Sequence, residues 1–346
     1  MIVAILLLFA VSAFFSFFEE KLGTFKWFVY SFIGLMLIIL AAIRPIGIDN
    51  DSLVYEDYFF HYDNPLYEMT VEYSYRWLSS LFYVMFKDVH SVFLFYAILG
   101  VSLKLFAFRK LTSKPFLALA IYICTYYILH EFTQIRVGVS SGILLFVIIL
   151  LGNDQRMKAL GLILIAMVFH YSSAMLLPLL FFSNEEMTER EKKFYLALIP
   201  LGYIFCFLHI ELTTLPIPYI ADKLESYQEM KEQGFLDEVN VFNLVYLVKI
   251  AMFFYLVSFY DIIKEHNKFL PIMVKMESIS LFSFSALSSL PVLSFRVSEL
   301  FGIVEIVLFA NIFYTIRSCW LSKIVVLGIG FVLLSITIFY NKLIQI

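Results

Sequence analysis

The sequence is poor in the residues on which most soluble protein sites depend. Only 15% of its 346 residues are charged, and it contains three cysteines and six histidines. The cysteines (Cys124, Cys206 and Cys319) lie in or beside apolar runs without CxxC pairing, which argues against a disulfide framework or a thiolate metal site. The histidines other than His170 show no i, i+3 or i, i+4 pairing, so we expect no metal site, and we also expect no cofactor. No Lys or Arg precedes the first apolar run, and we therefore expect no cleaved signal peptide.

Hydrophobic residues, by contrast, make up 62% of the chain, and its mean hydropathy is +0.88. This composition excludes an ordinary soluble domain. A helix needs about 20 apolar residues to cross a bilayer, and such runs recur from one end of the chain to the other. We predict an all-α, polytopic helical membrane protein that forms a single membrane domain over residues 1–346. The predicted spans cover approximately residues 2–18, 27–43, 89–108, 115–129, 137–151, 159–182, 194–212, 241–260, 269–290, 297–316 and 324–340.

Residues 72–86 form a shorter apolar stretch that Arg76 interrupts. Its aromatic and charged side chains suit the headgroup layer, which favours an interfacial helix lying on the membrane. A true span is the alternative, so the chain has 11 or 12 predicted membrane segments.

Basic turns set the orientation, because cytoplasmic loops carry an excess of Lys and Arg. Five turns are basic, and they contain Arg109 and Lys110, Arg156 and Lys158, Lys192 and Lys193, Lys264 and Lys268, and Arg317 and Lys323. Two acidic loops, about residues 44–75 and 213–240, then fall on the outer side. Residues 159–182 break the alternation, since both ends are basic; they form either a broken or re-entrant element with His170 near its outer tip, or one long helix.

Arg44 and Asp49 bracket the turn Pro45-Ile46-Gly47 at the outer end of the second span. Pro45 fixes one backbone angle and Gly47 permits a tight turn, so both charged side chains can face one pocket. The functional hypothesis pairs a phosphate-binding guanidinium with a carboxylate that accepts a proton. The alternative is an Arg that snorkels to the interface and an Asp that caps the next helix.

Arg136 opens a predicted helix that continues with Gly138, Ser140, Ser141 and Gly142. Small residues allow close approach of another helix or a ligand. The partial positive charge of a helix N-terminus adds to that of the guanidinium in attracting an anion. The alternative is ordinary helix packing in which Arg136 pairs with Glu131.

His170 and several further ionisable residues lie inside apolar runs. Such groups are functional candidates because a charge in hydrocarbon costs about 2.5 kcal/mol or more. Imidazole suits proton transfer near neutral pH, although a lone buried His also serves as a packing residue. Arg296 and Glu299 stand one helical turn apart and form either part of a site or a local ion pair. Glu277, Glu305 and Lys249 should face the interior, as mutual partners or along a polar cavity.

The ordered set of these motifs resembles the EpsG family of Wzy-like polysaccharide polymerases. It comprises Arg44-x-x-Gly47-x-Asp49 followed by Tyr55 and Phe59, then Glu72 and the helix after it, Gln134-Ile135-Arg136-Val137-Gly138, Phe169-His170-Tyr171-Ser172-Ser173, and Ser294-Phe295-Arg296. This chain departs from the family pattern after Asp49, where Asn50 stands, and at Val139 in place of Ala. Neither departure removes a candidate group.

The resemblance implies a membrane glycosyltransferase with a fold akin to the C-type glycosyltransferases. Its expected substrates are polyprenyl-pyrophosphate-linked oligosaccharides, joined into O-antigen, capsule or exopolysaccharide on the outer face of the bacterial cytoplasmic (inner) membrane. We expect Arg44, Arg136 and Arg296 to bind the pyrophosphate, and Asp49 or His170 to act as the catalytic base. Expected sugar contacts are Tyr55, Glu72, Glu131 and Gln134. Further expected partners are the lipid bilayer, a chain-length regulator and a flippase, with no nucleic acid.

Two alternatives share the same lipid-linked substrate. An O-antigen ligase typically carries one very large outer loop with basic and His residues, which the sequence does not show. A flippase or transporter should show repeated halves or paired broken helices, and neither is clear. The Asp49-Asn50-Asp51 spacing also matches the metal-binding DxD element of nucleotide-sugar transferases, but such short matches arise by chance and no nucleotide sugar is expected outside the membrane.

Overall fold

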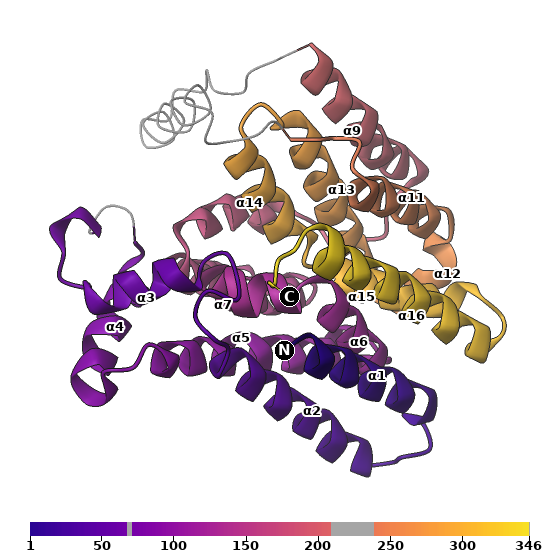
Figure 1. Ribbon diagram of the computed structural model, residues 1–346. Helices are drawn as coiled ribbons and strands as arrows, with labels where there is room; N and C mark the ends of the chain where they lie inside the picture. The colour runs from indigo at the N-terminus through magenta and orange to yellow at the C-terminus, as the bar shows by residue number, and fades with distance from the viewer. Residues whose placement is uncertain (68–70, 209–238, 346) are drawn as a thin grey trace.

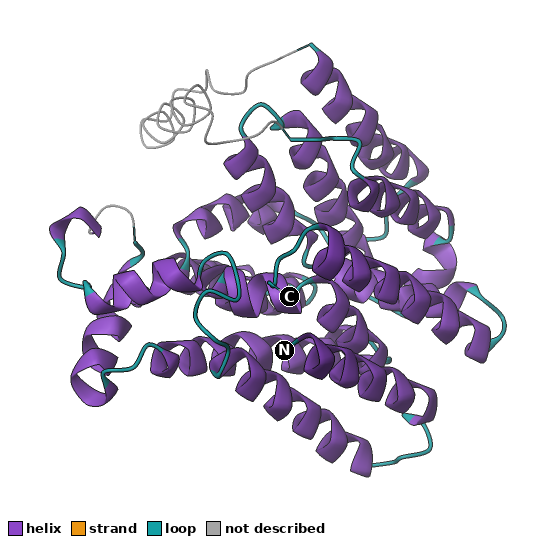
Figure 2. Ribbon diagram, viewed as in Figure 1, coloured by secondary structure: helices purple, strands orange, loops and turns teal. Residues whose placement is uncertain are grey.

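The computed structural model describes residues 1–67, 71–208 and 239–345, and these residues form helices joined by turns, without a β-strand among them (Figures 1 and 2). Three helical segments are long and apolar enough to cross a membrane, namely Phe25–Ala42, His90–Leu111 and Cys319–Tyr340. Six shorter apolar helices accompany them. The prediction of an all-α, polytopic helical membrane protein is confirmed. Most of the second acidic loop, residues 213–238, lies outside the described residues.

The first half of the chain supplies the layer at the bottom of Figure 1 and the part that projects to its left. Its elements are α1 (Ile2–Phe18), α2 (Phe25–Ala42), α3 (Ser52–Phe60), η1 (Pro65–Tyr67), α4 (Tyr73–Phe86), α5 (His90–Leu111), α6 (Pro115–Thr125), the π-helical turn η2 (Leu129–Thr133) and α7 (Ile135–Leu151). Helix α5 packs against α2 and α7, and α6 packs against α1. Residues Pro115 to Cys124 of α6 are all buried, so this helix lies inside the bundle.

The second half supplies most of the upper layer. Its elements are α8 (Arg156–Phe169), the 3-10 helix η3 (Tyr171–Phe181), α9 (Glu189–Phe207), α11 (Leu244–Ser258), α12 (Tyr260–Lys264), α13 (Leu270–Ala286), α14 (Pro291–Gly302), α15 (Glu305–Asn311), η5 (Ile312–Thr315), α16 (Cys319–Ser335) and η6 (Ile336–Tyr340). Helices α15 and α16 reach back to α6 and join the two halves. The predicted span 297–316 is therefore not one helix: it falls into the end of α14, α15 and η5.

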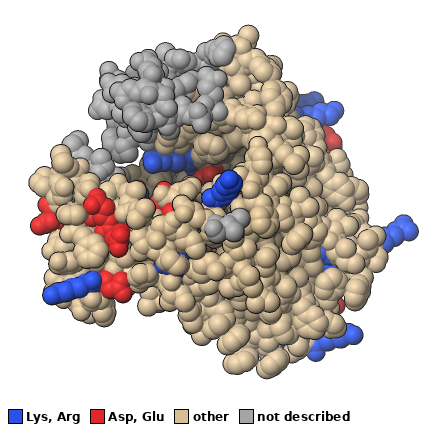
Figure 3. All heavy atoms as spheres, in the orientation of Figure 1, with Lys and Arg blue, Asp and Glu red and all other residues tan. Residues whose placement is uncertain are grey.

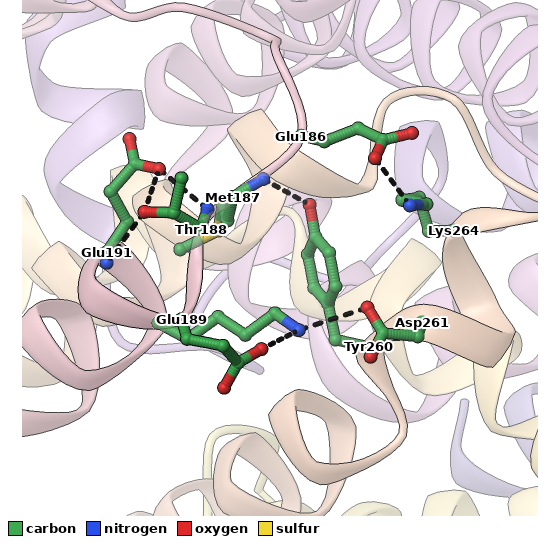
Figure 4. Close-up of polar contacts among 9 residues, drawn as sticks. Glu186, Met187, Thr188, Glu189, Glu191, Tyr260, Asp261 and Lys264 are labelled. Carbon is green, nitrogen blue, oxygen red and sulfur yellow. Dashed lines mark hydrogen bonds and ion pairs between the residues drawn. The ribbon is translucent and has the colours of Figure 1, made fainter.

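One end of the bundle carries the basic turns, and we call it the basic end. Arg109 at the end of α5 stacks over Trp27 at the start of α2, 4.0 Å from the ring centroid. Figure 4 shows the same end at the start of α9, where Thr188 and Glu191 form a capping box. There Lys192 bonds to Asp261 at 3.0 Å and the Tyr260 hydroxyl accepts the N–H of Met187 at 3.1 Å, so α9 is fixed to α12.

The segment after α7 leaves the basic end and returns to it. Lys268 donates from Nζ to Asn153 Oδ1 at 2.9 Å, just before α8, and its carbonyl oxygen accepts from Asn184 Nδ2 at 2.9 Å, just after η3. Between them the backbone breaks at His170, which is extended at φ −151° and ψ 114°. One lysine thus holds both ends, and the re-entrant alternative for residues 159–182 is the one that the structure adopts. His170 lies at the tip.

Helix α4 has both of its ends at the opposite end of the bundle from the basic turns. Its N-cap, Glu72, pairs with Arg136. After α4 the chain turns at Lys87 into α5, whose first residue, His90, lies with Nε2 3.1 Å from the carbonyl oxygen of Arg44. At 14 residues α4 is also shorter than the roughly 20 that a span needs. This placement agrees with an interfacial helix and not with a true span.

The C-terminal tail returns to the turn that follows α2. Ile344 forms an isolated antiparallel bridge with Asp49, and Gln345 donates its N–H to the carbonyl oxygen of Ile48 at 2.8 Å. The Ile344 side chain is fully buried. The C-terminal tail therefore helps to hold the turn that contains Ile48 and Asp49.

Candidate active site

The turn after α2 is built around a guanidinium that is entirely buried. Arg44 is 0% exposed, and its Nε bonds to Asp49 Oδ2 at 3.0 Å. Its two terminal nitrogens donate to the carbonyl oxygens of Ala41 at 2.8 Å and Phe132 at 2.9 Å, and its Cζ atom lies 3.7 Å from the ring centroid of Phe93. Arg44 therefore ties α2 to the π-helical turn η2. Its predicted contact with a pyrophosphate stays a prediction.

Both oxygens of the Asp49 carboxylate are engaged in the same turn. Oδ2 faces Arg44, and Oδ1 accepts the backbone N–H groups of Asp51 at 3.0 Å and Ser52 at 2.9 Å. Gly47 makes this geometry possible, since its φ of 84° lies in the left-handed region that side chains other than glycine rarely adopt. The proton-accepting role predicted for Asp49 is untested, but both oxygens already have partners.

Arg136, in the first turn of α7, forms an ion pair with Oε2 of Glu72, the N-cap of α4. Its guanidinium also lies over the ring of Tyr55 in α3, 5.4 Å from the centroid. The other Glu72 oxygen, Oε1, is 2.8 Å from Nδ1 of His170. One carboxylate thus joins the α7 arginine to the histidine at the tip of the α8–η3 hairpin, over 64 and 98 residues of sequence.

Three of the sequence-predicted residues, Arg136, Glu72 and His170, are therefore brought into one network. Sequence reasoning placed each of them in a site but did not pair them. The alternative in which Arg136 pairs with Glu131 is wrong. Tyr55 belongs to the same group, although its side chain is only 2% exposed.

The three predicted arginines converge on a residue that the sequence-based site assignment omitted. The positive charges of Arg136, Arg296 and Arg44 all act on the carboxyl of Asp51, at the N-cap of α3. Burial is the largest influence on this carboxyl, and together with the neighbouring Asp49 it raises the pKa of Asp51 to about 6. The signal in the sequence was the Asp49-x-Asp51 spacing, which is too short and too common to distinguish a site from a turn.

A space-filling view of this side of the molecule shows charged side chains close together, in agreement with a cluster of charged groups around Asp51. Figure 3 shows a hollow with basic and acidic side chains at its floor, beside an acidic surface over the region of α3. Asp57 in α3 and Asp63 shortly after this helix are both exposed. The predicted acidic character of the first outer loop is therefore seen at its surface. Among the described residues no group of three or more His, Cys, Asp or Glu side chains has the arrangement of a metal site.

The π-helical turn before α7 is held by a buried ion pair. Lys104 of α5 donates from Nζ to Glu131 Oε1 at 2.6 Å and to the carbonyl oxygen of Gly138 at 2.6 Å. Tyr122 donates its hydroxyl to the same Glu131 oxygen at 2.7 Å. Lys104 is 0% and Glu131 1% exposed. Single π turns often occur at functional sites, and this one sets the direction of the helix that carries Arg136. The sugar contact predicted for Glu131 stays a prediction.

Gln134, the N-cap of α7, reaches the other half of the bundle, where its Nε2 donates to Glu299 Oε2 of α14 at 3.0 Å. Deeper in that half, Lys249 of α11 forms an ion pair with Glu305 of α15 at 2.8 Å. Of the two alternatives that the sequence left open, Lys249 and Glu305 adopt the one in which they are mutual partners; the Glu305 side chain is fully buried and that of Lys249 is 24% exposed. Arg296 also lies on α14, so this helix presents both Arg296 and Glu299 toward the first half of the chain.

A family model described as the EpsG family matches residues 27–345, which is nearly the whole chain. No curated protein and no solved structure gives a significant match.

Proposed function

We infer the function from one premise: the chain belongs to the EpsG family, whose members are Wzy-like polymerases. We propose that it joins polyprenyl-pyrophosphate-linked oligosaccharide repeat units into O-antigen or a related surface polysaccharide. The site lies on the outer, periplasmic side of the bacterial cytoplasmic membrane, opposite the basic end. An excess of Lys and Arg favours a cytoplasmic position for the basic end.

The observation that carries the proposal is that Arg136, Arg296 and Arg44, from three different elements, lie close enough to Asp51 for their positive charges to act on its carboxyl. Transfer of a growing chain breaks the bond between its anomeric carbon and the lipid pyrophosphate, so negative charge develops on the leaving phosphate. Guanidiniums held in place before the reaction, in a site poor in water, stabilise that charge and are among the largest catalytic terms. Their planar forks of donors also match phosphate oxygens.

The exposure of the three arginines indicates that they have different roles. Arg136 and Arg296 are partly exposed, whereas Arg44 is fully buried. We propose that Arg136 and Arg296 bind the pyrophosphate. Arg44 holds the turn and adds positive charge from its buried position without contacting the ligand. The pair of Glu72 and His170 keeps Arg136 in place and is available for proton transfer. Tyr55 and Gln134 line the side on which the sugars are expected.

The test is a gel ladder of surface polysaccharide from a deletion strain that is complemented with variants. We expect the deletion to leave single repeat units, the wild-type gene to restore the ladder, and Arg136→Ala to fail. The matched control is Arg156→Ala, which removes an exposed arginine from the basic end. An Arg156→Ala strain with a normal ladder excludes a general effect of losing one cation.

The outcomes separate this activity from two others with the same lipid-linked substrate. A deletion strain with no repeat unit on its lipid acceptor would indicate a ligase or a flippase. An unchanged ladder in the deletion strain would contradict a role in this assembly. A flippase and a chain-length regulator remain the proposed partners of the polymerase.

A further inference from the structure

We propose that Asp51 is the catalytic carboxylate that takes the proton from the attacking sugar hydroxyl, an inference that rests on the proposed function. The candidates predicted from the sequence were Asp49 and His170. The geometry points instead to the residue two positions after Asp49.

The other carboxylates of this centre already have partners. Asp49 gives one oxygen to Arg44 and the other to two backbone N–H groups. Glu72 gives one oxygen to Arg136 and the other to His170. The Asp51 side chain, in contrast, forms no hydrogen bond or ion pair within the described part of the chain, not even to the N-terminus of the helix that it caps.

The backbone of Asp51 is held by hydrogen bonds on both sides, whereas its carboxylate forms none within the described residues. Its backbone N–H is held by Asp49, and its carbonyl oxygen accepts the N–H of Tyr55 at 2.9 Å. Tyr55 lies under the guanidinium of Arg136. The carboxylate therefore stands one helical turn from the ring on which Arg136 rests, and it is partly exposed.

The charges around Asp51 suit a base that works near neutral pH. The groups that act on it are Asp49 and Arg44 from the same turn, Arg136 from α7 and Arg296 from α14. Burial and Asp49 bring the pKa of Asp51 to about 6 in spite of the three cations. A carboxylate of this kind is ionised at pH 7 yet more basic than an ordinary one, which is what general-base catalysis favours.

The step balances within the proposed reaction. The acceptor hydroxyl oxygen bonds to the anomeric carbon of the donor chain, and the bond from that carbon to the pyrophosphate oxygen breaks. The lipid pyrophosphate leaves with the bonding electron pair and is held by Arg136 and Arg296. The hydroxyl proton moves to the Asp51 carboxylate, which later releases it to water.

The experiment compares Asp51→Asn, Asp51→Glu and the control Asn50→Ala, which changes the exposed neighbour. Each variant is scored in the deletion strain by the polysaccharide ladder. Each is also purified and tested with farnesyl pyrophosphate, a soluble prenyl pyrophosphate, for ligand-induced thermal stabilisation. Farnesyl pyrophosphate probes the arginines without requiring the sugar chemistry.

We expect Asp51→Asn to lower polymer formation by about 10²–10⁴-fold, with the ligand-induced stabilisation retained and the melting temperature no lower than that of the wild type. Asp51→Glu should restore part of the ladder, and Asn50→Ala should be normal. A normal ladder in Asp51→Asn overturns the proposal. So does loss of the ladder together with loss of ligand stabilisation or a lower melting temperature, because Asp51 would then be a structural residue.

Failure of the proposed function has a different signature. In that case the wild-type gene does not change the ladder, or farnesyl pyrophosphate stabilises neither wild type nor Arg136→Ala. The role of Asp51 is then overturned along with it. When the wild-type gene restores the ladder, the amount of polymer formed by Asp51→Asn relative to wild type tests the role of Asp51 alone.

Discussion

The buried pair of Lys104 and Glu131 provides the sharpest prediction about stability. Removing one partner of a buried ion pair leaves the other charge uncompensated and typically costs about 3–5 kcal/mol. Both side chains here are at most 1% exposed, and their charged atoms lie 2.6 Å apart. Lys104→Met should therefore cost about 3–5 kcal/mol, a large share of a total stability of roughly 5–15 kcal/mol.

Glu131→Gln keeps the shape of the side chain and one acceptor for the Tyr122 hydroxyl, so we expect a cost near the lower end, about 3 kcal/mol. The double variant has no uncompensated charge. Its cost should fall well below the sum of the two single costs, with a coupling energy of about 1–3 kcal/mol. Because Lys104 also donates to the Gly138 carbonyl oxygen, Lys104→Met and the double variant should disturb the helix start that carries Arg136.

The assay is a double-mutant cycle, with the free energy of unfolding in detergent measured for wild type, both single variants and the double variant. Lys110→Met, on the same helix but exposed, is the control and should change stability by less than about 0.5 kcal/mol. Single variants that each cost under about 1 kcal/mol, or costs that simply add, would refute the reasoning.

Three further predictions concern the same end of the bundle. In Gly138→Ala the added methyl would overlap the carbonyl oxygen of His130, so the variant should melt lower and form little polymer, as measured by thermal unfolding and the ladder. Ile344→Asp buries an unpaired charge beside Asp49 and should lower the melting temperature and the yield of folded protein in size-exclusion chromatography. Burial and Asp49 raise the pKa of Asp51 from 3.8 to about 6, so its contribution to stability is complete below pH 3.8 and is lost as the pH rises through about 6; Asp51→Asn should flatten this part of the stability profile.

The sequence was sufficient for the class and for the approximate positions of most helical segments. Long apolar runs and basic turns are properties of composition, and they do not depend on which helix packs against which. The predicted span 27–43 differs from α2 by two residues at its start and by one at its end. The predicted span 297–316 was wrong as a single helix, because α14 ends at Gly302 and α15 begins at Glu305. Gly302 is closely packed, since a Cβ there would lie 2.8 Å from the hydroxyl oxygens of Ser280 and Tyr126.

The site was predicted as a set of residues but not as a set of pairs. Arg136 and Glu72 lie 64 residues apart, and Lys104 and Glu131 lie 27 apart. No local periodicity specifies such partners, since they depend on how helices pack. The π turn at Leu129–Thr133 adds to this, because it redirects Glu131 toward α5 just before Arg136. The importance of Asp51 likewise appears only when three helices and a turn bring their charges together.

The α8–η3 hairpin also has a consequence for the bilayer itself. With 14 and 11 residues, its arms reach about 21 and 22 Å at roughly 1.5 and 2.0 Å per residue. The hydrocarbon layer is about 30 Å thick, so a tip that starts from the basic end stops short of the far headgroups. A segment shorter than the hydrocarbon layer is accommodated by local thinning of the bilayer, by snorkelling of flanking side chains or by oligomerisation. If the proposed pyrophosphate site lies beside this tip, bilayer thickness should affect the proposed activity, and we expect reconstitution into long-chain lipids to lower polymer formation.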